Sequence, residues 1–382
     1  EVHNLRKICD EIFGERNFIA NIIWEKNFAP KNNVEGFSTN HDYIICYSKN
    51  IQYFSRHLLP MTEEQKSRYQ NLDNDPRGPW KSDDLTSMGS GYNYEVITPA
   101  GAVKVPASGR SWIYSKEVLE ELIKDNRVWF GVNGNNMPRL KKFITEVQKG
   151  IVPVTIWSHK EVGHTQASKQ EIKNLFDGKD IFDTPKPVKL IRKIVYLVTD
   201  KDSIVLDFFS GSATTAQAVM ELNAEDGGNR KYIMVQLPEP TDEKSKAYKA
   251  GYKNIAEIGK ERIRRAGKKI KEETEADIDY GFRVFKVDSS NMKDVYYRPD
   301  ELDQNMLDQL ESNIKEDRTS LDLLTQVMLE LGLELSLPIE TKEIRGKEVH
   351  FVAENSLVAC FDEEVDEELI KEIAKTKPLK VV

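Results

Sequence analysis

The sequence has 382 residues, of which 39% are hydrophobic and 31% are charged, and its formal net charge is −8. This length allows two or three domains. No apolar run reaches the roughly 18 residues of a membrane span, and the three cysteines form no CxxC pair. The composition therefore excludes an integral membrane protein, argues against a zinc site or a disulfide framework, and predicts a cytoplasmic protein without a metal centre.

The negative charge is concentrated near the end of the chain. Residues 301–382 contain 9 Lys and Arg against 20 Asp and Glu, whereas residues 101–200 contain 17 against 11. Local basic surface, more than total charge, governs contact with phosphates. The charge distribution therefore permits nucleic-acid binding by the front part of the chain.

The first 165 residues contain regular elements followed by an irregular region. Apolar residues at helical spacing predict a helix that ends at Gly14, and strands are expected over 17–26 and 41–50. The unbroken apolar run 43–47 indicates a strand covered on both faces. Between 51 and 165 we expect short strands and turns, with helices near 115–125 and 138–148. Because the chain begins with Glu, we expect a piece of a longer protein.

The pattern of residues 186–237 is that of a βαβ unit. A helix over 186–199 precedes a strand that begins at Ser203, and a helix over 214–223 leads to a buried strand over 231–237. A basic amphipathic helix is expected over 253–271. Beyond residue 281 an acidic α+β domain is expected, with a helix over 319–332 and strands within 347–361. The predicted fold class is therefore α/β with a parallel, doubly wound sheet.

The turn of the βαβ unit, "DFFSGSATT" (207–215), is the strongest candidate ligand site. It has one glycine, so it matches neither the GxGxxG dinucleotide fingerprint nor the GxxxxGK[ST] phosphate loop. An acidic residue at a strand end can accept from an ammonium group, an aromatic ring can cover an adenine, and a small-residue turn lets a ligand approach the backbone. An ordinary capped strand-to-helix turn remains the alternative from these residues alone.

This segment resembles the S-adenosylmethionine loop of amino-directed DNA methyltransferases, usually D-x-F-x-G-S-G-T-T. Outside the loop, "FDTPKPVKLIRKI", "IIWEK" and "HDYIICYSKN" resemble further segments of that family. Four stretches, "NDPRGPWKSDDL", "VWFGVNGNNMPRLKKF", "VGHTQASKQEI" and "GGNRKYIMVQLPEP", resemble the modification (Mod) subunit of type III restriction–modification systems. The resemblance implies a Rossmann-like methyltransferase fold in the circularly permuted order of the β group, which transfers a methyl group from S-adenosylmethionine to an adenine amine in DNA.

The resemblance also assigns cofactor-binding residues. Asp207 would hold the methionine ammonium, Phe209 would cover the adenine, and Gln236 or Glu239 would meet the ribose. Thr184, Lys186 and Pro187 would lie near the methionine carboxylate. The loop would be lined by Ser210, Gly211, Ser212, Ala213, Thr214 and Thr215. Ala213 replaces the usual second glycine, which is compatible with the loop only if its φ angle is negative.

The sequence indicates the DNA-contacting residues less clearly than the cofactor-binding residues. Trp24 and Lys26 are candidates beside the target nucleotide, and Arg77, Arg110 and Arg139 are candidates for reading DNA, since Arg suits guanine in the major groove. The family tetrapeptide [DNS]-P-P-[YFW], which orients the target base, is absent from the 382 residues. We expect it to precede Glu1, so no catalytic residue is assigned, and this chain alone should not methylate.

The expected domains are the end of the catalytic half (1–50), an inserted target-recognition region (51–165), the S-adenosylmethionine half (166–280) and a C-terminal assembly domain (281–382). The expected partners are double-stranded DNA, a second copy in a homodimer and the restriction (Res) subunit, with no membrane. A cytosine-amino or RNA methyltransferase stays open as an alternative, as does a non-catalytic DNA-binding or assembly subunit of the same fold.

Overall fold

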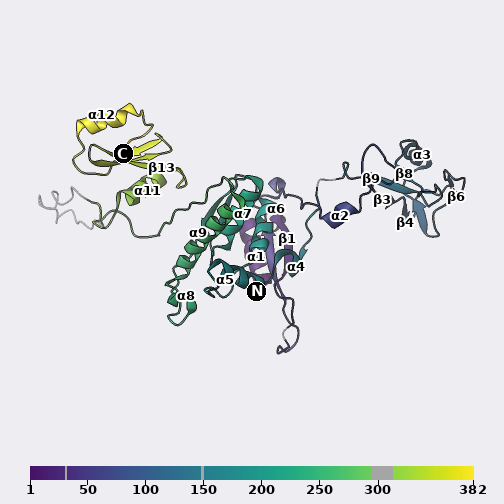
Figure 1. Cartoon of the computed structure of the whole chain (residues 1–382), viewed down its shortest axis with the longest axis horizontal. Helices are drawn as coiled ribbons and strands as arrows, with labels where there is room; N and C mark the ends of the chain where they lie inside the picture. Colours follow the sequence, from purple (N-terminus) through teal and green to yellow (C-terminus); the bar gives the residue numbers. More distant parts are fainter. Residues whose placement is uncertain (31, 148–149, 294–312) are drawn as a thin grey trace. The chain divides into compact units, whose positions relative to one another are not determined.

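The structure is a computed structural model that describes residues 1–30, 32–147, 150–293 and 313–382. The chain divides into two compact units, Glu1–Gly281 and Phe282–Val382 (Figure 1). Small sheets and helices give both units a mixed α and β structure. In the described part of the chain no helix combines the length and the apolar character needed to cross a bilayer.

A three-stranded sheet lies near the start of the chain. Its central strand β1 (Phe18–Glu25) pairs antiparallel with β2 (His41–Tyr47) and parallel with β10 (Ile156–Trp157). Helix α1 (Val2–Phe13) ends at Gly14, which has a positive φ angle of 85°. These predicted elements are confirmed. The expectation that β2 is covered on both faces is wrong, because β2 is an edge strand on which Tyr43 is 45% exposed.

The predicted βαβ unit is confirmed. Strands β11 (Ile204–Asp207) and β12 (Lys231–Met234) pair in parallel, and α7 (Thr214–Asp226) connects them. One face of this sheet packs against α7, through Val205, Tyr232, Val219 and Leu222. On the opposite face Leu206 of β11 is 57% exposed and Ile233 of β12 is 51% exposed. Strand β12 is therefore not the buried strand that its apolar run predicts.

Helix α6 (Val188–Val198) packs against both small sheets. Leu190 and Leu197 lie in one core cluster with Trp24 of β1 and Trp157 of β10. Val195, on another side of the same helix, packs with Val219 and Leu222 of α7. A helix with apolar residues on two sides can join two layers of a fold. The position of α6 therefore links the β1 sheet to the β11 strand and the loop that follows it.

Helix α9 (Ile255–Thr274) supports α7 from outside. Its buried residues include Ile258, Gly259, Arg262 and Ile263, and Ile258 packs with Ile172 of α5. The other short elements of this unit are η1 (Glu15–Asn17), η2 (Ile51–Tyr53), α4 (His159–Val162), α5 (Thr165–Leu175) and α8 (Lys246–Lys249).

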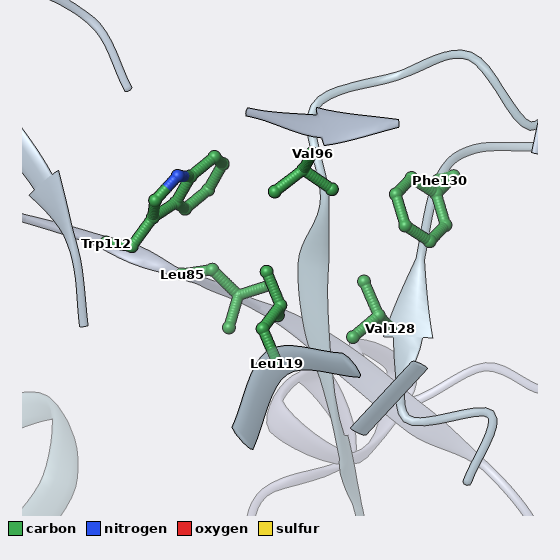
Figure 2. Packing of buried hydrophobic residues seen from close by; sticks show 6 residues of the cluster. All are labelled: Leu85, Val96, Trp112, Leu119, Val128 and Phe130. Atoms are coloured by element: carbon green, nitrogen blue, oxygen red, sulfur yellow. The ribbon is translucent and has the colours of Figure 1, made fainter. Parts of the chain in front are cut away.

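Residues 62–147 form short antiparallel pairs around a separate hydrophobic core. The elements are α2 (Glu63–Ser67), β3 (Trp80–Asp84), β4 (Thr86–Met88), β5 (Val96–Ile97), β6 (Val103–Lys104), β7 (Arg110–Trp112), α3 (Lys116–Lys124), β8 (Val128–Trp129) and β9 (Arg139–Phe143). Figure 2 shows the core residues Leu85, Val96, Trp112, Leu119, Val128 and Phe130. The cluster joins strands and α3, so these residues have a core of their own.

The helix predicted near 115–125 is confirmed as α3, but the helix predicted near 138–148 is wrong. Residues 139–143 form β9, which pairs with β3 and β8. In β9 the buried positions alternate, at Lys141 and Phe143, and the Lys141 ammonium is held by the carboxylates of Asp73 and Asp75. A buried lysine disguises the strand pattern, because the residue reads as polar in the sequence.

The C-terminal unit is an antiparallel sheet with helices. It contains α11 (Ser320–Glu330), β13 (Ile339–Ile344), β14 (Lys347–Val352), β15 (Leu357–Ala359) and α12 (Glu367–Lys375), with the strand order β13-β14-β15. The predicted helix over 319–332 and the strands within 347–361 are confirmed. Two apolar clusters, around Leu324 and around Phe351, form the core of this unit.

Candidate functional site

The 207–215 loop turns the chain from β11 into α7 with two residues in the left-handed region. Gly211 has a φ angle of 52° and Ala213 one of 59°. The turn is closed by a hydrogen bond of 2.7 Å from the Ala213 amide to the Ser210 carbonyl. The prediction of a negative φ angle at Ala213 is therefore wrong. Ala213 is 2% exposed and packs toward Gly259 of α9, so packing with α9 accompanies the strained conformation.

Asp207 is fixed at the carboxyl end of β11. Its Oδ2 accepts a hydrogen bond of 2.6 Å from the Thr215 hydroxyl, and its Oδ1 accepts one of 3.2 Å from the Phe209 amide. Asp207 is half-buried, and each carboxylate oxygen can accept a second bond. The carboxylate is thus oriented by the loop and retains capacity for a cationic group.

An exposed aromatic pair and an apolar hollow lie beside Asp207. Phe209 is 82% exposed, and its ring centroid is 4.9 Å from that of Phe208. A hollow of about 330 Å³ is bordered by Asp207, Phe209 and Thr215, together with apolar residues of α6 and β11. The loop therefore offers an aromatic face and a largely apolar wall next to an oriented carboxylate.

The two residues predicted to contact the ribose differ in their hydrogen bonds and in their exposure to solvent. The Gln236 Oε1 atom accepts a hydrogen bond of 2.7 Å from the Gly211 amide, and its Nε2 donates to the Leu237 carbonyl at 3.2 Å. Glu239 is exposed. In this structure Gln236 holds the loop onto β12, and the Glu239 carboxylate faces solvent.

The segment 182–187 lies beside the same loop. A Cβ atom placed on Gly211 would be 3.5 Å from Cζ of Phe182, and the buried Ser168 hydroxyl donates to the Pro185 carbonyl at 2.7 Å. Thr184 and Lys186 are exposed, whereas Pro187 is buried at the start of α6. The structure therefore places Phe182, two residues before Thr184, against the Asp207 to Thr215 loop.

Trp24 and Lys26 lie at the end of β1, next to Lys186. Trp24 is 2% exposed and donates its indole N–H to the Gly163 carbonyl at 3.0 Å, so its ring is a core element in this conformation. Lys26 pairs with Asp42 at 2.6 Å, and Lys186 lies 3.7 Å from the other oxygen of Asp42 and 5.1 Å from the Trp24 ring centroid. Sequence reasoning missed Asp42, although an acid beside an apolar strand is a visible signal.

The candidate DNA-reading arginines separate into two groups. Arg77 binds Asp75 at 2.9 Å and Asp125 at 3.2 Å, and its hydrogen bonds hold the pKa of the Asp75 carboxyl below its ordinary value. Arg110 donates to Thr86 and, like Arg139, approaches Asp84. Arg139 is the most exposed of the three, with 46% of its side chain accessible. The structure thus brings Arg110 and Arg139 together and leaves Arg77 in a separate ion-pair network.

The two histidines of the "SHKEVGHT" segment have structural partners. The His164 side chain accepts from the Ala167 amide and caps α5, and His159 contacts Glu25 at 2.7 Å. Hydrogen bonds from the His159 amide and ring lower the pKa of Glu25. Over the residues that the structure describes, no three His, Cys, Asp or Glu side chains are grouped as they would be around a metal ion.

These features, a βαβ unit with an oriented strand-end carboxylate and a small-residue turn, are those of α/β folds in which ligands bind at the carboxyl ends of parallel strands. The comparison with known families specifies this class: the chain belongs to the N6 and N4 methyltransferase family described as DNA methylases, which matches residues 1–239.

Three relatives agree with this family. The chain is 38% identical over 293 residues to the Mod subunit of the type III restriction–modification enzyme StyLTI of Salmonella typhimurium, covering 75% of this chain and 44% of the relative. It is 27% identical to the EcoP15I Mod subunit of Escherichia coli, covering 75% and 48%. It is 29% identical to the type II methyltransferase M.KpnI of Klebsiella pneumoniae, covering 68% and 65%.

The resemblance to modification subunits drawn from the short motifs is therefore confirmed. The chain spans about half the length of the Mod subunits that it matches.

Proposed function

We propose that this chain is the cofactor-binding and DNA-recognition part of a site-specific DNA methyltransferase of a type III restriction–modification system. The reaction would transfer a methyl group from S-adenosylmethionine to the exocyclic amine of adenine. The observation that carries the proposal is the oriented carboxylate of Asp207, next to an exposed Phe209 and a small-residue turn, in a chain of the DNA methylase family. The proposed fold is the permuted, doubly wound methyltransferase sheet.

The residues of the loop fit S-adenosylmethionine, which supplies an electrophilic methyl group. Asp207 has remaining acceptor capacity for the methionine ammonium, since the loop supplies one donor to each oxygen. The exposed ring of Phe209 can cover an adenine face, and the hollow beside it has an apolar wall. Thr184 and Lys186 are accessible on the neighbouring segment, where a carboxylate could be held.

The ribose assignment falls on Glu239 in preference to Gln236. The amide oxygen of Gln236 already anchors the loop at the Gly211 amide, while its Nε2 donates to the neighbouring Leu237 carbonyl. The half-buried bond to Gly211 is lost if the side chain turns to a ligand. Glu239 is exposed three residues after Gln236, and a carboxylate accepts well from two hydroxyl groups. We assign Gln236 to the loop and Glu239 to the sugar.

The DNA assignments rest on the core of residues 62–147 and on the arginines at its surface. We assign target recognition to residues 51–165 and cofactor binding to 166–280, with residues 1–50 beside the target base and 281–382 in assembly. Arg110 and Arg139 are assigned to DNA, because their side chains are more exposed than that of Arg77. The proposed partners of the complete protein are double-stranded DNA, the Res subunit and a second copy of the same chain.

Calorimetric titration with S-adenosylmethionine tests the cofactor proposal. Asp207→Ala should weaken binding at least tenfold, about 1.4 kcal/mol. Asp202→Ala is the matched control, because Asp202 is an exposed acid just before β11 and should have no effect. Equal affinity of the wild-type chain and Asp207→Ala would overturn the assignment of the loop.

Methyl transfer is tested separately from cofactor binding. The 382 residues contain no [DNS]-P-P-[YFW] tetrapeptide, whose polar groups accept the hydrogens of the adenine amine in this family. The chain should therefore bind S-adenosylmethionine without methylating a duplex, while the complete protein forms methyladenine. Transfer of labelled methyl groups by the 382-residue chain alone would show that residues within it supply the missing acceptors. Methylcytosine from the complete protein would instead favour the cytosine-amino alternative.

A further inference from the structure

Two histidines near the end of β1 each use one ring nitrogen inside the fold. The Nδ1 atom of His159 lies 2.7 Å from Oε2 of Glu25, and the Nδ1 atom of His164 accepts a hydrogen bond of 3.3 Å from the Ala167 amide. Among the residues that the structure describes, no hydrogen bond involves the Nε2 atom of either ring. Neither atom is among the buried polar atoms without a partner, so both Nε2 atoms are accessible from solvent.

The partners of the two rings select opposite tautomers. A backbone N–H only donates, so Nδ1 of His164 carries the lone pair and Nε2 of the neutral ring carries the proton. Hydrogen bonds from the His159 amide and ring lower the pKa of the Glu25 carboxyl, so the carboxylate is ionised and Nδ1 of His159 carries the proton. In the neutral ring of His159, Nε2 is then an acceptor. The pair therefore presents one acceptor, on His159, and one donor, on His164.

The two imidazole rings lie close together beside an aromatic side chain. Their centroids are 5.9 Å apart, and the ring of Phe28 lies 5.7 Å from that of His159 and 5.2 Å from that of His164. Phe28 is 54% exposed, so the three rings form a small cluster at the surface. Rings at this separation allow one donor and one acceptor to reach the same edge of a base.

The turn that joins the two histidines is held in place from two sides. The Gly163 carbonyl accepts from the Trp24 indole at 3.0 Å, and the Thr165 amide donates to the Lys26 carbonyl at 3.0 Å. A Cβ atom on Gly163 would lie 2.9 Å from Cβ of Pro187, so the turn packs closely against the start of α6. Recognition by a preorganised pair of this kind loses little conformational freedom on binding.

A donor beside an acceptor matches the major-groove edge of adenine. Adenine presents the N6 amine as a donor next to the N7 acceptor, whereas guanine presents two acceptors, O6 and N7. Cytosine presents its N4 amine there, and thymine presents the O4 acceptor and a methyl group. Lys160, between the two histidines in the sequence, is exposed and can contact a phosphate beside this edge.

We infer that His159 and His164 read one adenine of the recognition sequence in the major groove. Nε2 of His159 accepts a hydrogen bond from the N6 amine, and the Nε2–H group of His164 donates one to N7. The inference rests on the proposed function, which assigns target recognition to residues 51–165, and it names two specificity-determining residues of that region. The adenine that they read stays within the duplex, because its major-groove edge is the one contacted.

The test measures binding of the complete protein to duplexes that contain its methylated sequence. At each adenine other than the methylated one, 7-deazaadenine removes the N7 acceptor alone, and a guanine–cytosine pair exchanges the N6 donor for an acceptor. At one of these positions, each change should weaken binding by the wild-type protein about tenfold.

Asparagine variants remove each Nε2 atom and keep the bond that Nδ1 makes. His164→Asn retains an acceptor for the Ala167 amide and should bind the adenine and 7-deazaadenine duplexes equally. His159→Asn retains a donor for Glu25 and should lose most of the discrimination against guanine. His57→Asn is the matched control, because His57 contacts the Thr199 carbonyl at the opposite end of α6, and it should keep both preferences.

The outcomes separate the inference from the proposed function. If the complete wild-type protein shows no sequence-specific DNA binding, the proposed function fails and the inference fails with it. If the protein binds specifically, the inference alone is overturned by a recognition sequence without a second adenine, by an absence of any response to 7-deazaadenine, or by variants that respond as the wild type does. Asn is a favoured N-cap residue, so His164→Asn preserves the cap of α5 and decides the question if His159→Asn does not fold.

Discussion

Ala213 offers a direct measurement of the strain in the loop. A non-glycine residue in the left-handed region costs about 1–2 kcal/mol, so Ala213→Gly should relieve about that amount. Two opposing terms apply: loss of a buried methyl group, about 0.8 kcal/mol, and the greater freedom of glycine in the unfolded chain, about 0.4–1 kcal/mol. Because these terms nearly cancel, Ala213→Gly should change the free energy of unfolding by less than about 1 kcal/mol.

Ala216→Gly is the matched control, because Ala216 is fully buried in the first turn of α7. This change removes a similar methyl group and about 1 kcal/mol of helix propensity, without relieving strain. It should destabilise by about 2 kcal/mol. Urea denaturation followed by circular dichroism measures both variants from the shift in midpoint at an unchanged slope. A loss of about 2 kcal/mol for Ala213→Gly as well would refute the positive φ angle.

Three further predictions concern residues 62–147. Lys141→Met should lower the free energy of unfolding by about 3 kcal/mol, because it leaves the Asp73 and Asp75 carboxylates without their buried partner. The control Lys142→Met changes an exposed lysine and should lower it by less than about 1 kcal/mol. Equal urea midpoints for the two variants would contradict this prediction. The Arg77 hydrogen bonds lower the pKa of Asp75 on folding. Ionised Asp75 therefore stabilises the folded chain above its unfolded pKa of about 3.9, and this stabilisation is lost as the pH falls below that value. The stability difference between wild type and Asp75→Asn should therefore shrink in acid, and a difference that is constant from pH 7 to pH 3 would speak against this linkage. The slope of DNA affinity against salt concentration can be measured on the complete protein. Arg139→Gln should reduce this slope by about one counterion, whereas Arg77→Gln should lower stability and leave the slope unchanged. The reverse pattern would exchange the roles of the two arginines.

The sequence by itself determined the local elements and the family. The strands β1 and β11 and the helices α6 and α7 follow from apolar spacing within a dozen residues, and the loop follows from a run of small residues after a strand. Local signals of this kind do not depend on which distant residues become neighbours. Short motifs spread over the chain were enough to indicate the modification subunits that the comparisons confirm.

The tertiary structure decided the features that depend on distant neighbours. Lys141 can occupy a buried position of the strand 139–143 only because Asp73 and Asp75 neutralise it from almost 70 residues away in the sequence. Arg262 reaches Ser212 across 50 residues, so no pattern near the loop reveals it. The φ angle of Ala213 likewise accompanies the packing of α9 on the turn. Buried charge and backbone strain are stabilised by long-range contacts, and a single sequence does not specify such contacts.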